Sequence, residues 1–181
     1  MHIHWFPGHM QKAMRQIEEK LKLIDIVIEI VDSRAPQSSK NKFLENLTKS
    51  KKRIIVMSKK DLADPSLLKK WEEKYKNENY YPVPCNLNNN QDVNDILKAI
   101  QVVGKDKIDR DIRRGMKPQP IRVMVIGIPN VGKSTLINRL SKRGSAGTAN
   151  TPGHTRSQQW IRVDKTLELL DTPGILPPHY D

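Results

Sequence analysis

One stretch constrains the fold of this chain more than any other: residues 127–135, which spell GIPNVGKST. The stretch has the form GxxxxGKS, which is typical of the phosphate-binding loop of nucleoside triphosphatases. An apolar run over 121–126 predicts a buried strand before the loop. Leu136, Ile137 and Leu140 recur at helical spacing after it. Strand, glycine loop and helix therefore stand in the order that a phosphate loop requires, which an ordinary glycine turn would not explain.

Each residue type in this loop has a chemical reason to be there. Successive backbone N–H groups up to Lys133 can surround a β-phosphate, and glycine lets the backbone come close. A helix that starts near Lys133 directs the positive end of its dipole at the same charge. The Lys133 ammonium can reach the β- and γ-phosphates, and the Ser134 hydroxyl can bind Mg²⁺. The residues assigned to the nucleotide are Asn130, Val131, Gly132, Lys133, Ser134 and Thr135.

Composition limits the class of protein. The chain has 181 residues, enough for one domain with a real core, and a formal net charge of +12, so a polyanion is an expected partner. Charge alone does not choose between RNA, DNA and a membrane surface. Cys85 is the single cysteine, which excludes an intrachain disulfide and favours a reducing compartment. No apolar run approaches the ~18 residues of a membrane helix, and the N-terminus lacks a signal core. We therefore expect a soluble, cytoplasmic protein with no membrane partner.

The pattern of apolar residues alternates between the periods of strands and helices. Strands are predicted over 24–31, 53–57, 81–84, 121–126, 158–163 and 166–170, and helices over 9–23, 40–49, 64–76, 92–103 and 133–142. A charge-rich segment over 104–120, ending KPQP, predicts a linker. The alternation predicts an α/β fold with a mostly parallel sheet flanked by helices.

A second motif follows the strand at 53–57. A guanine pocket needs a carboxylate that accepts hydrogen bonds from N1–H and N2–H₂ of the base, and a strand ending in NKxD supplies one. Ser58-Lys59-Lys60-Asp61, here called the base-recognition loop, matches three of those four positions. Asp61 would bind guanine, and the Lys59 stem would lie against the base. The alternative is a solvated turn. Serine replaces asparagine at position 58, so one hydrogen bond can be lost there. Cys85 and Asn86, after the next strand, are assigned to the loop behind the base.

The metal and γ-phosphate elements come after the phosphate loop. Residues 171–174 spell DTPG and follow an apolar strand, as a DxxG motif should. Asp171 would hold Mg²⁺ through water, and the Gly174 N–H would contact the γ-phosphate. The polar stretch between the motifs predicts a switch loop. Thr155 is the expected Mg²⁺ ligand there, with Thr151 as the second choice.

The motifs occur in the order base recognition, phosphate loop, switches, whereas a common GTPase has its base-recognition motif last. Only 10 residues follow Asp171, too few for a later one. The order predicts a circularly permuted P-loop GTPase domain over 1–181, and neighbouring domain termini make such a rearrangement feasible. The predicted parts are an N-terminal helix over 1–23, a base-recognition half over 24–103, the 104–120 linker, and a phosphate-loop and switch half over 121–181.

The motifs together resemble a known family. HWFPGHM at 4–10, DSRAP at 32–36, GIPNVGKST, PGHT at 152–155, QQW at 158–160 and DTPG are similar to the YlqF/RbgA family of bacterial circularly permuted GTPases, also called ribosome biogenesis GTPase A. The resemblance covers essentially the whole chain. It implies a role in late assembly of the large ribosomal subunit, with the subunit precursor and rRNA as partners. It also implies a C-terminal RNA-contacting domain, which is absent here, so a truncated or incompletely ordered product is expected.

The usual water-positioning glutamine after DxxG is Ile175 here, whose side chain cannot hydrogen-bond. His9 is therefore the candidate catalytic residue beside Lys133 and Gly174, and the resemblance points the same way. The alternative is that His9 caps or packs the first helix. A metal site of N-terminal histidines is disfavoured, because no cysteine or carboxylate accompanies them. Asn130 matches the phosphate-loop asparagine of potassium-stimulated GTPases, which makes it a candidate K⁺ ligand; the alternative is a structural asparagine in a tight loop.

Basic residues form three clusters. They are Lys49, Lys51, Lys52 and Arg53; Lys105, Lys107, Arg110, Arg113, Arg114 and Lys117; and Arg139, Lys142, Arg143 and Arg156. Any one run can be a solvated face, but the net charge favours an RNA-facing surface. The sequence thus predicts a GTP-hydrolysing assembly switch that uses Mg²⁺. One alternative is an RNA-binding assembly factor with a weakly active or vestigial nucleotide site, and another is a phosphotransferase.

Overall fold

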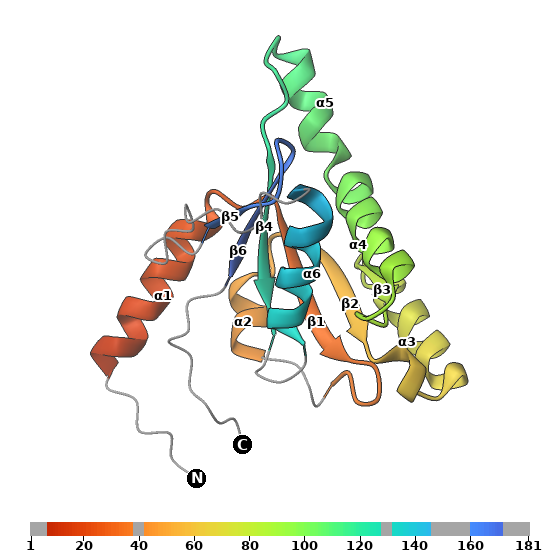
Figure 1. The fold of residues 1–181 in the computed structure, drawn as a ribbon. Coiled ribbons are helices and arrows are strands. Elements are labelled where there is room, and N and C mark those ends of the chain that lie inside the picture. The colour runs from red at the N-terminus through yellow and green to blue at the C-terminus, as the bar shows by residue number, and fades with distance from the viewer. Residues whose placement is uncertain (1–6, 38–41, 128–131, 146–159, 172–181) are drawn as a thin grey trace.

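The computed structural model describes residues 7–37, 42–127, 132–145 and 160–171. Its centre is a six-stranded sheet with the strand order β3-β2-β1-β4-β6-β5 (Figure 1). All neighbouring strands are parallel except β5 and β6, which form an antiparallel hairpin. The strands are β1 (Ile26–Asp32), β2 (Lys52–Ser58), β3 (Tyr81–Pro84), β4 (Ile121–Ile126), β5 (Trp160–Arg162) and β6 (Leu167–Asp171). The predicted mostly parallel α/β sheet is confirmed.

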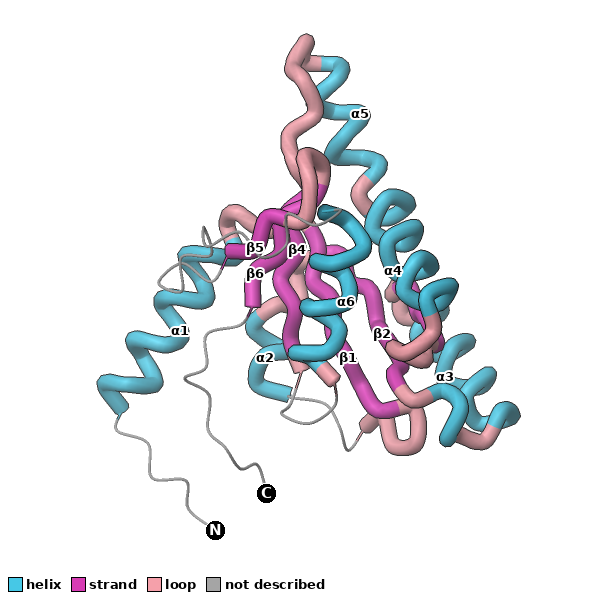
Figure 2. Tube along the Cα trace, in the orientation of Figure 1, coloured by secondary structure: helices cyan, strands magenta, loops and turns pink. Residues whose placement is uncertain are grey.

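Helices cover both faces of this sheet, giving three layers (Figure 2). One core cluster joins α4 and α6 to the β1 face that carries Ile26, Ile28 and Ile30. Two further clusters join α1, α2 and α3 to the opposite face. The helices are α1 (Pro7–Leu21), α2 (Lys42–Leu47), α3 (Pro65–Asn77), α4 (Asn90–Val103), α5 (Lys105–Arg113) and α6 (Lys133–Ser145), with a 3₁₀ turn, η1 (Lys60–Leu62). Within the described ranges, none of these helices has the length and apolar character needed to cross a bilayer.

The chain diverges from the middle of the sheet. β1 and β4 are adjacent and parallel, with Ile26 opposite Val123. From β1 the chain continues outward to β2 and β3, whereas from β4 it continues to β6 and β5 on the other side. The helices that follow β1 and β4, α2 and α6, pack on opposite faces. This is a topological switch point, and open α/β sheets bind ligands in the crevice at the carboxyl ends of such strands.

Local signals explain most of the element boundaries. Pro7 stands in the first turn of α1, where its missing N–H costs nothing. The carboxylate of Asp64 caps α3 by accepting from the Ser66 N–H at 2.9 Å, and Pro65 follows at the first helical position. α1 begins and ends two residues before the predicted 9–23, and the other shared elements match within two or three residues where the chain is described.

The 104–120 segment differs from the prediction. It does connect the two halves, but its first part is a helix, α5, rather than a linker without secondary structure. Gly104 ends α4 and begins α5, so the two helices are nearly continuous. The Lys107 ammonium donates to the carbonyls of Gln119 and Pro120 at 3.2 and 2.7 Å, and the Asp111 carboxylate accepts from the Gln119 N–H at 3.0 Å. These contacts bind α5 to the chain that returns to β4.

Arg53 is the other correction. The sequence placed it in a surface cluster of basic residues, but its side chain is buried in the sheet–helix interface. The guanidinium lies 3.2 Å from the Glu29 carboxylate on β1 and donates to the Thr48 hydroxyl at 2.6 Å. Removing one partner of a buried ion pair leaves an uncompensated charge, which typically costs ~3–5 kcal/mol. Arg53 therefore contributes to stability and is unavailable to a polyanion.

Candidate functional site

The predicted motifs converge at one edge of the sheet. β1, β2, β4 and β6 are parallel, so their carboxyl ends share that edge. Asp32, Ser58 and Asp171 are the last residues of β1, β2 and β6, and the phosphate loop follows β4. Segments far apart in the sequence therefore lie at one edge of the sheet, beside the switch point.

The described part of the phosphate loop has the expected backbone. Gly132 adopts a φ of +106°, a conformation that other residues rarely adopt. A Cβ at this position would lie 3.0 Å from Leu87 Cδ1, so glycine also permits close contact with the loop behind the base. The Leu136 N–H donates to the Gly132 carbonyl at 2.8 Å, which begins α6. Ser134 and Thr135 are exposed in its first turn. Asn130 and Val131 lie outside the described residues.

Lys133 faces the predicted metal ligand. Its ammonium nitrogen lies 3.1 Å from Asp171 Oδ1. This oxygen is buried and, apart from the ion pair, has no hydrogen-bond donor among the described residues. The pair joins the first residue of α6 to the last residue of β6, the strand that lies beside β4. The structure thus brings together two residues that the sequence had assigned to one phosphate–metal centre.

The oxygen atoms of Asp171 and Ser134 are of the kind that binds a magnesium ion. Mg²⁺ keeps several waters and is usually held by one or two carboxylates together with substrate phosphates. Asp171 Oδ1 is an available acceptor for a metal-bound water, and Ser134 is an exposed hydroxyl at the start of α6. Over the ranges described, no three His, Cys, Asp or Glu side chains gather into a self-sufficient metal site. Thr155, the other predicted ligand, lies outside the described residues, as do Gly174 and Ile175.

The base-recognition loop is held in an unusual conformation. Lys59 has φ 58° and ψ 38°, a left-handed backbone that costs a non-glycine residue about 1 kcal/mol. The Ser58 hydroxyl donates to the Val31 carbonyl at 3.0 Å, which ties the loop to β1. Asp61 is exposed in the 3₁₀ turn that follows. Its carboxylate is therefore accessible to a ligand at this edge, while its contact with a base remains a prediction.

Asp92 joins the two loops that would surround the base, and sequence reasoning did not identify it. Its carboxylate is buried in the first turn of α4. One oxygen lies 3.0 Å from the Lys60 ammonium, and the other accepts from the Asn86 N–H at 2.9 Å. The Lys60 N–H also donates to the Cys85 carbonyl at 3.3 Å. The only sequence signal was an acidic residue on the first turn of a helix, which is commonly explained by the helix dipole.

Asp32 was also missed as a site residue. Arg34 binds its carboxylate through Nε at 3.0 Å and Nη2 at 2.7 Å, and the Arg34 N–H adds a third bond at 2.9 Å. The Lys59 ammonium lies 3.5 Å from the same carboxylate. Hydrogen bonds from the Arg34 side chain are the largest cause that lowers the pKa of Asp32 to about 2. Asp32 is therefore ionised at neutral pH and can orient Lys59.

Cys85 is a buried thiol behind the base-recognition loop. Burial, followed by the negative charge of Asp92, raises its pKa to about 12. The thiol is therefore protonated at neutral pH and unreactive, and Cys85 contributes through its backbone. Its N–H donates to the Met57 carbonyl at 2.8 Å, which extends the pairing of β2 and β3. His9 lies within α1, and its side chain is outside what the structure describes.

Comparison with known proteins agrees with this geometry. The model of a family described as 50S ribosome-binding GTPase matches residues 122–181. Ribosome biogenesis GTPase A from Bacillus licheniformis is 50% identical over the whole chain, and the Bacillus cereus protein of that name is 48% identical. The crystal structure of GNP-bound YlqF from Thermotoga maritima superposes with a TM-score of 0.59 at 29% identity, covering 93% of this chain and 60% of that one. These similarities support a YlqF/RbgA-type GTPase domain.

A domain of this type accounts for the order of the motifs. As expected of a YlqF/RbgA-type domain, the base-recognition strand β2 precedes the phosphate loop and β6 in the chain, so the domain is circularly permuted. The chain spans 64% of the length of the Bacillus licheniformis relative and 61% of the Bacillus cereus relative.

Proposed function

We propose that this chain is the GTP-binding and GTP-hydrolysing switch of a factor that acts in late assembly of the bacterial large ribosomal subunit. The observation that carries the proposal is that the base-recognition loop, the start of α6 and Asp171 lie at the same edge of the sheet. The names of the relatives, Ribosome biogenesis GTPase A, support the assembly role.

In this proposal Asp61 selects guanine. Its carboxylate accepts from N1–H and N2–H₂ of the base, a pair of donors that adenine lacks. Lys59 lies along the base, oriented by Asp32, and Ser58, Cys85 and Asn86 line the pocket. The contact between the Asp92 carboxylate, Lys60 and Asn86 supports this assignment, because it holds both sides of the pocket in place.

The phosphates bind at the start of α6. The N–H groups of the phosphate loop surround the β-phosphate, and the Lys133 ammonium exchanges its partner Asp171 for the phosphates. Ser134, Thr155 and Asp171 would hold Mg²⁺, which neutralises charge that develops on the phosphate oxygens. The Gly174 N–H would bind the γ-phosphate. Asn130 is the proposed ligand of a K⁺ ion that supplies further positive charge.

Hydrolysis by the isolated protein is expected to be slow. Ile175 cannot orient water, and the proposed substitute is His9 at the start of α1. Phosphoryl transfer depends mainly on positioning and charge, so an assembling partner that orders these residues can add ~10³–10⁵-fold to the rate. The proposed partners are rRNA and the precursor of the large subunit, which implies a cytoplasmic protein.

The test is GTP turnover by the protein with and without large-subunit precursor particles, using Lys133→Ala as the inactive control. We expect tight GTP binding, a basal rate of ~10⁻⁴–10⁻³ s⁻¹, and stimulation by particles towards the range above. Tight GTP binding with a turnover rate that the particles do not raise would refute the assembly role. Absence of GTP binding would remove the switch itself and favour an RNA-binding factor with a vestigial site.

A further inference from the structure

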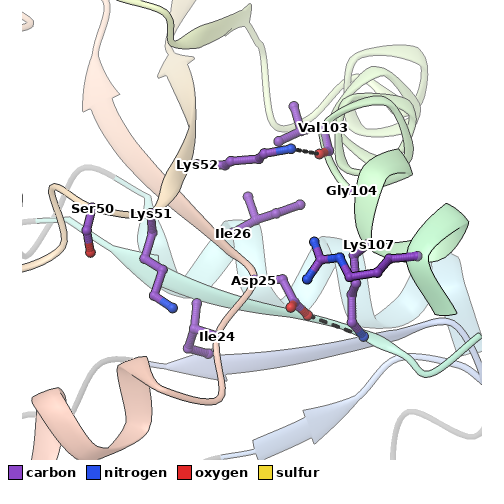
Figure 3. A pocket seen from close by; sticks show the side chains of 10 residues that line it. Ile24, Asp25, Ile26, Ser50, Lys51, Lys52, Val103, Gly104 and Lys107 are labelled. Carbon is purple, nitrogen blue, oxygen red and sulfur yellow. Dashed lines mark hydrogen bonds and ion pairs between the residues drawn. The ribbon is translucent and has the colours of Figure 1, made fainter. Parts of the chain in front are cut away.

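A pocket with a volume of about 220 Å³ lies at the opposite edge of the sheet from the nucleotide site. It is lined by the segment that enters β1, the start of β2, and the junction of α4 and α5 (Figure 3). The amino ends of the parallel strands β1 and β2 form this edge. The proposed GTPase chemistry uses none of these residues. They are Ile24, Asp25, Ile26, Ser50, Lys51, Lys52, Val103, Gly104, Lys107 and Arg110.

The lining is strongly basic, and its cations divide into two pairs. The ammonium of Lys52 is paired with Asp106 at 2.8 Å, and that of Lys107 lies 3.5 Å from Asp25. Within the described ranges Lys51 and Arg110 form no salt bridge, although both belong to the lining. Figure 3 shows Lys51 extending from the start of β2 towards Ile24 and Asp25. Two cationic side chains are thus available to an anion, while the other two are neutralised by their carboxylate partners.

The walls of the pocket are preorganised. Asp25 accepts from the Arg122 N–H at 2.9 Å, which attaches the entry of β1 to β4. Lys107 is held at once by Asp25 and by the carbonyls of Gln119 and Pro120. At Gly104 a Cβ would come within 2.6 Å of Ile121 Cδ1, so glycine lets the α4–α5 junction pack directly on the sheet. A ligand would therefore meet a formed site and need to order few groups.

The pocket continues into a basic arm. α5 and the segment that returns to β4 project away from the sheet (Figure 1). Residues 105–120 carry six cationic side chains against three acidic ones. Arg110, Arg113, Arg114 and Lys117 are exposed along the arm, and Arg110 belongs to both the arm and the pocket. A row of cations that begins in a pocket suits an extended chain of phosphates better than one small anion.

We infer that this pocket and α5 bind the phosphate backbone of RNA, with Lys51 and Arg110 as the two direct phosphate contacts. The choice of RNA over another polyanion rests on the proposed function, since a ribosomal precursor presents RNA phosphates over much of its surface. Lys and Arg contacts of this kind position a protein on RNA without selecting sequence. The site lies away from the nucleotide, so it can anchor the domain while the crevice at the carboxyl edge stays open.

The test compares Lys51→Gln/Arg110→Gln with the parent protein, using a labelled RNA hairpin at several KCl concentrations. The matched control is Lys69→Gln/Lys70→Gln, which removes the same charge from exposed positions on α3. We expect the pocket variant to lose affinity ~10-fold or more at ~0.1 M salt, and its salt slope to fall by about 1.5–2. The control should lose less than ~3-fold. Ser50→Glu, which places a negative charge in the lining, should weaken RNA binding as well.

Other outcomes overturn the inference. An equal loss in the control pair would show that net charge alone is responsible. If the pocket variant kept RNA affinity but lost binding to phosphatidylserine vesicles, the ligand would be a lipid surface. GTP affinity is measured on every protein, because an unchanged value shows that the variants are folded. A parent protein that binds RNA through the pocket but does not hydrolyse GTP would refute the proposed function and leave the RNA site standing.

Discussion

Replacing Asp92 by alanine should loosen both loops of the proposed guanine pocket. The carboxylate is buried and bonds the Lys60 ammonium at 3.0 Å and the Asn86 N–H at 2.9 Å. Leaving the N–H without a partner costs ~1–3 kcal/mol. The partly exposed Lys60 adds at most ~1 kcal/mol, and the interaction with the α4 dipole adds ~0.3–1 kcal/mol. These contributions overlap, so we expect the free energy of unfolding to fall by about 2–3 kcal/mol.

The functional effect should be larger on binding than on chemistry. If the loss leaves the open form of the loops ~1.5–2 kcal/mol more stable than the closed form, the binding-competent state is a minor one, and the Kd for GTP rises ~10–30-fold. Hydrolysis of bound GTP should change little, because Lys133 and Asp171 are untouched. Fluorescent-GTP titration, single-turnover hydrolysis and thermal unfolding measure these three quantities.

Two variants make the Asp92 experiment specific. Asp95→Ala removes another carboxylate from α4, one that accepts an exposed 3.4 Å hydrogen bond from the Gln91 side chain, so GTP affinity should be unaffected. Asp92→Asn keeps an acceptor for the Asn86 N–H and loses only the Lys60 ion pair, so it should fall between the parent and alanine. A folded Asp92→Ala protein that binds GTP as tightly as the parent would refute the positioning role.

Four further outcomes are expected. Asp61→Asn should shift preference from guanine to xanthine nucleotides, by up to ~10⁴ if the pocket pairs fully with the base; unchanged GTP affinity would exclude Asp61. If Asn130 holds K⁺, hydrolysis should be faster in KCl than in NaCl at equal ionic strength, and equal rates would contradict the ion site. His9→Ala should lower the particle-stimulated rate by ~10²-fold with GTP affinity nearly constant; lost affinity at an unchanged stimulated rate would mark His9 as structural. Because the pKa of Asp32 falls from 3.8 unfolded to about 2 folded, its contribution to stability, about 1–2 kcal/mol after solvent screening, is present above pH ~4 and lost as pH drops towards 2. In an acid-unfolding titration, the Asp32→Asn variant should therefore lose less stability than the parent between pH ~4 and pH ~2.

The elements that sequence predicted well are those whose signals are local. The strand, glycine loop and helix around Gly132 are adjacent in the sequence, and the strand that ends at Ser58 contains the apolar run 54–57. Asp64 and Pro65 mark the start of α3 in two adjacent positions. Each of these signals depends on backbone conformation and burial of neighbouring residues, so the sequence alone sufficed.

The 104–120 segment shows why a helix can be missed. α5 is dominated by charged residues, and its apolar contribution to the core is a single partly buried residue, Ile108. Its stability comes instead from Lys107 and Asp111, which bond the backbone of Gln119 and Pro120. Contacts between a side chain and a carbonyl a dozen residues away leave no periodic pattern in the sequence.

The polar contacts of the site required the three-dimensional pairing of strands. Asp32 and Lys59 meet because β1 and β2 end side by side, with Asp32 opposite Ser58. The buried pair of Glu29 and Arg53 follows the same logic, and here a signal did exist. Glu29 stands alone among the apolar residues of β1, which indicates a buried charge that needs a partner, whereas Arg53 directly follows Lys51 and Lys52 and therefore resembles part of a surface cluster.

The pairing of β1 with β4 has a consequence for the order in which the domain is made. Asp25 and Arg122 are bonded across 97 positions of the chain. During synthesis, β1, β2 and the base-recognition loop leave the ribosome before the phosphate loop is made. The edge of β1 that pairs with β4 in the finished sheet is unpaired during that time. Exposed strand edges invite association, so a nascent chain paused near Gly104 should depend on chaperones. In the proposed function the nucleotide needs both the phosphate loop after β4 and Asp171 on β6, so its binding would mark a completed domain.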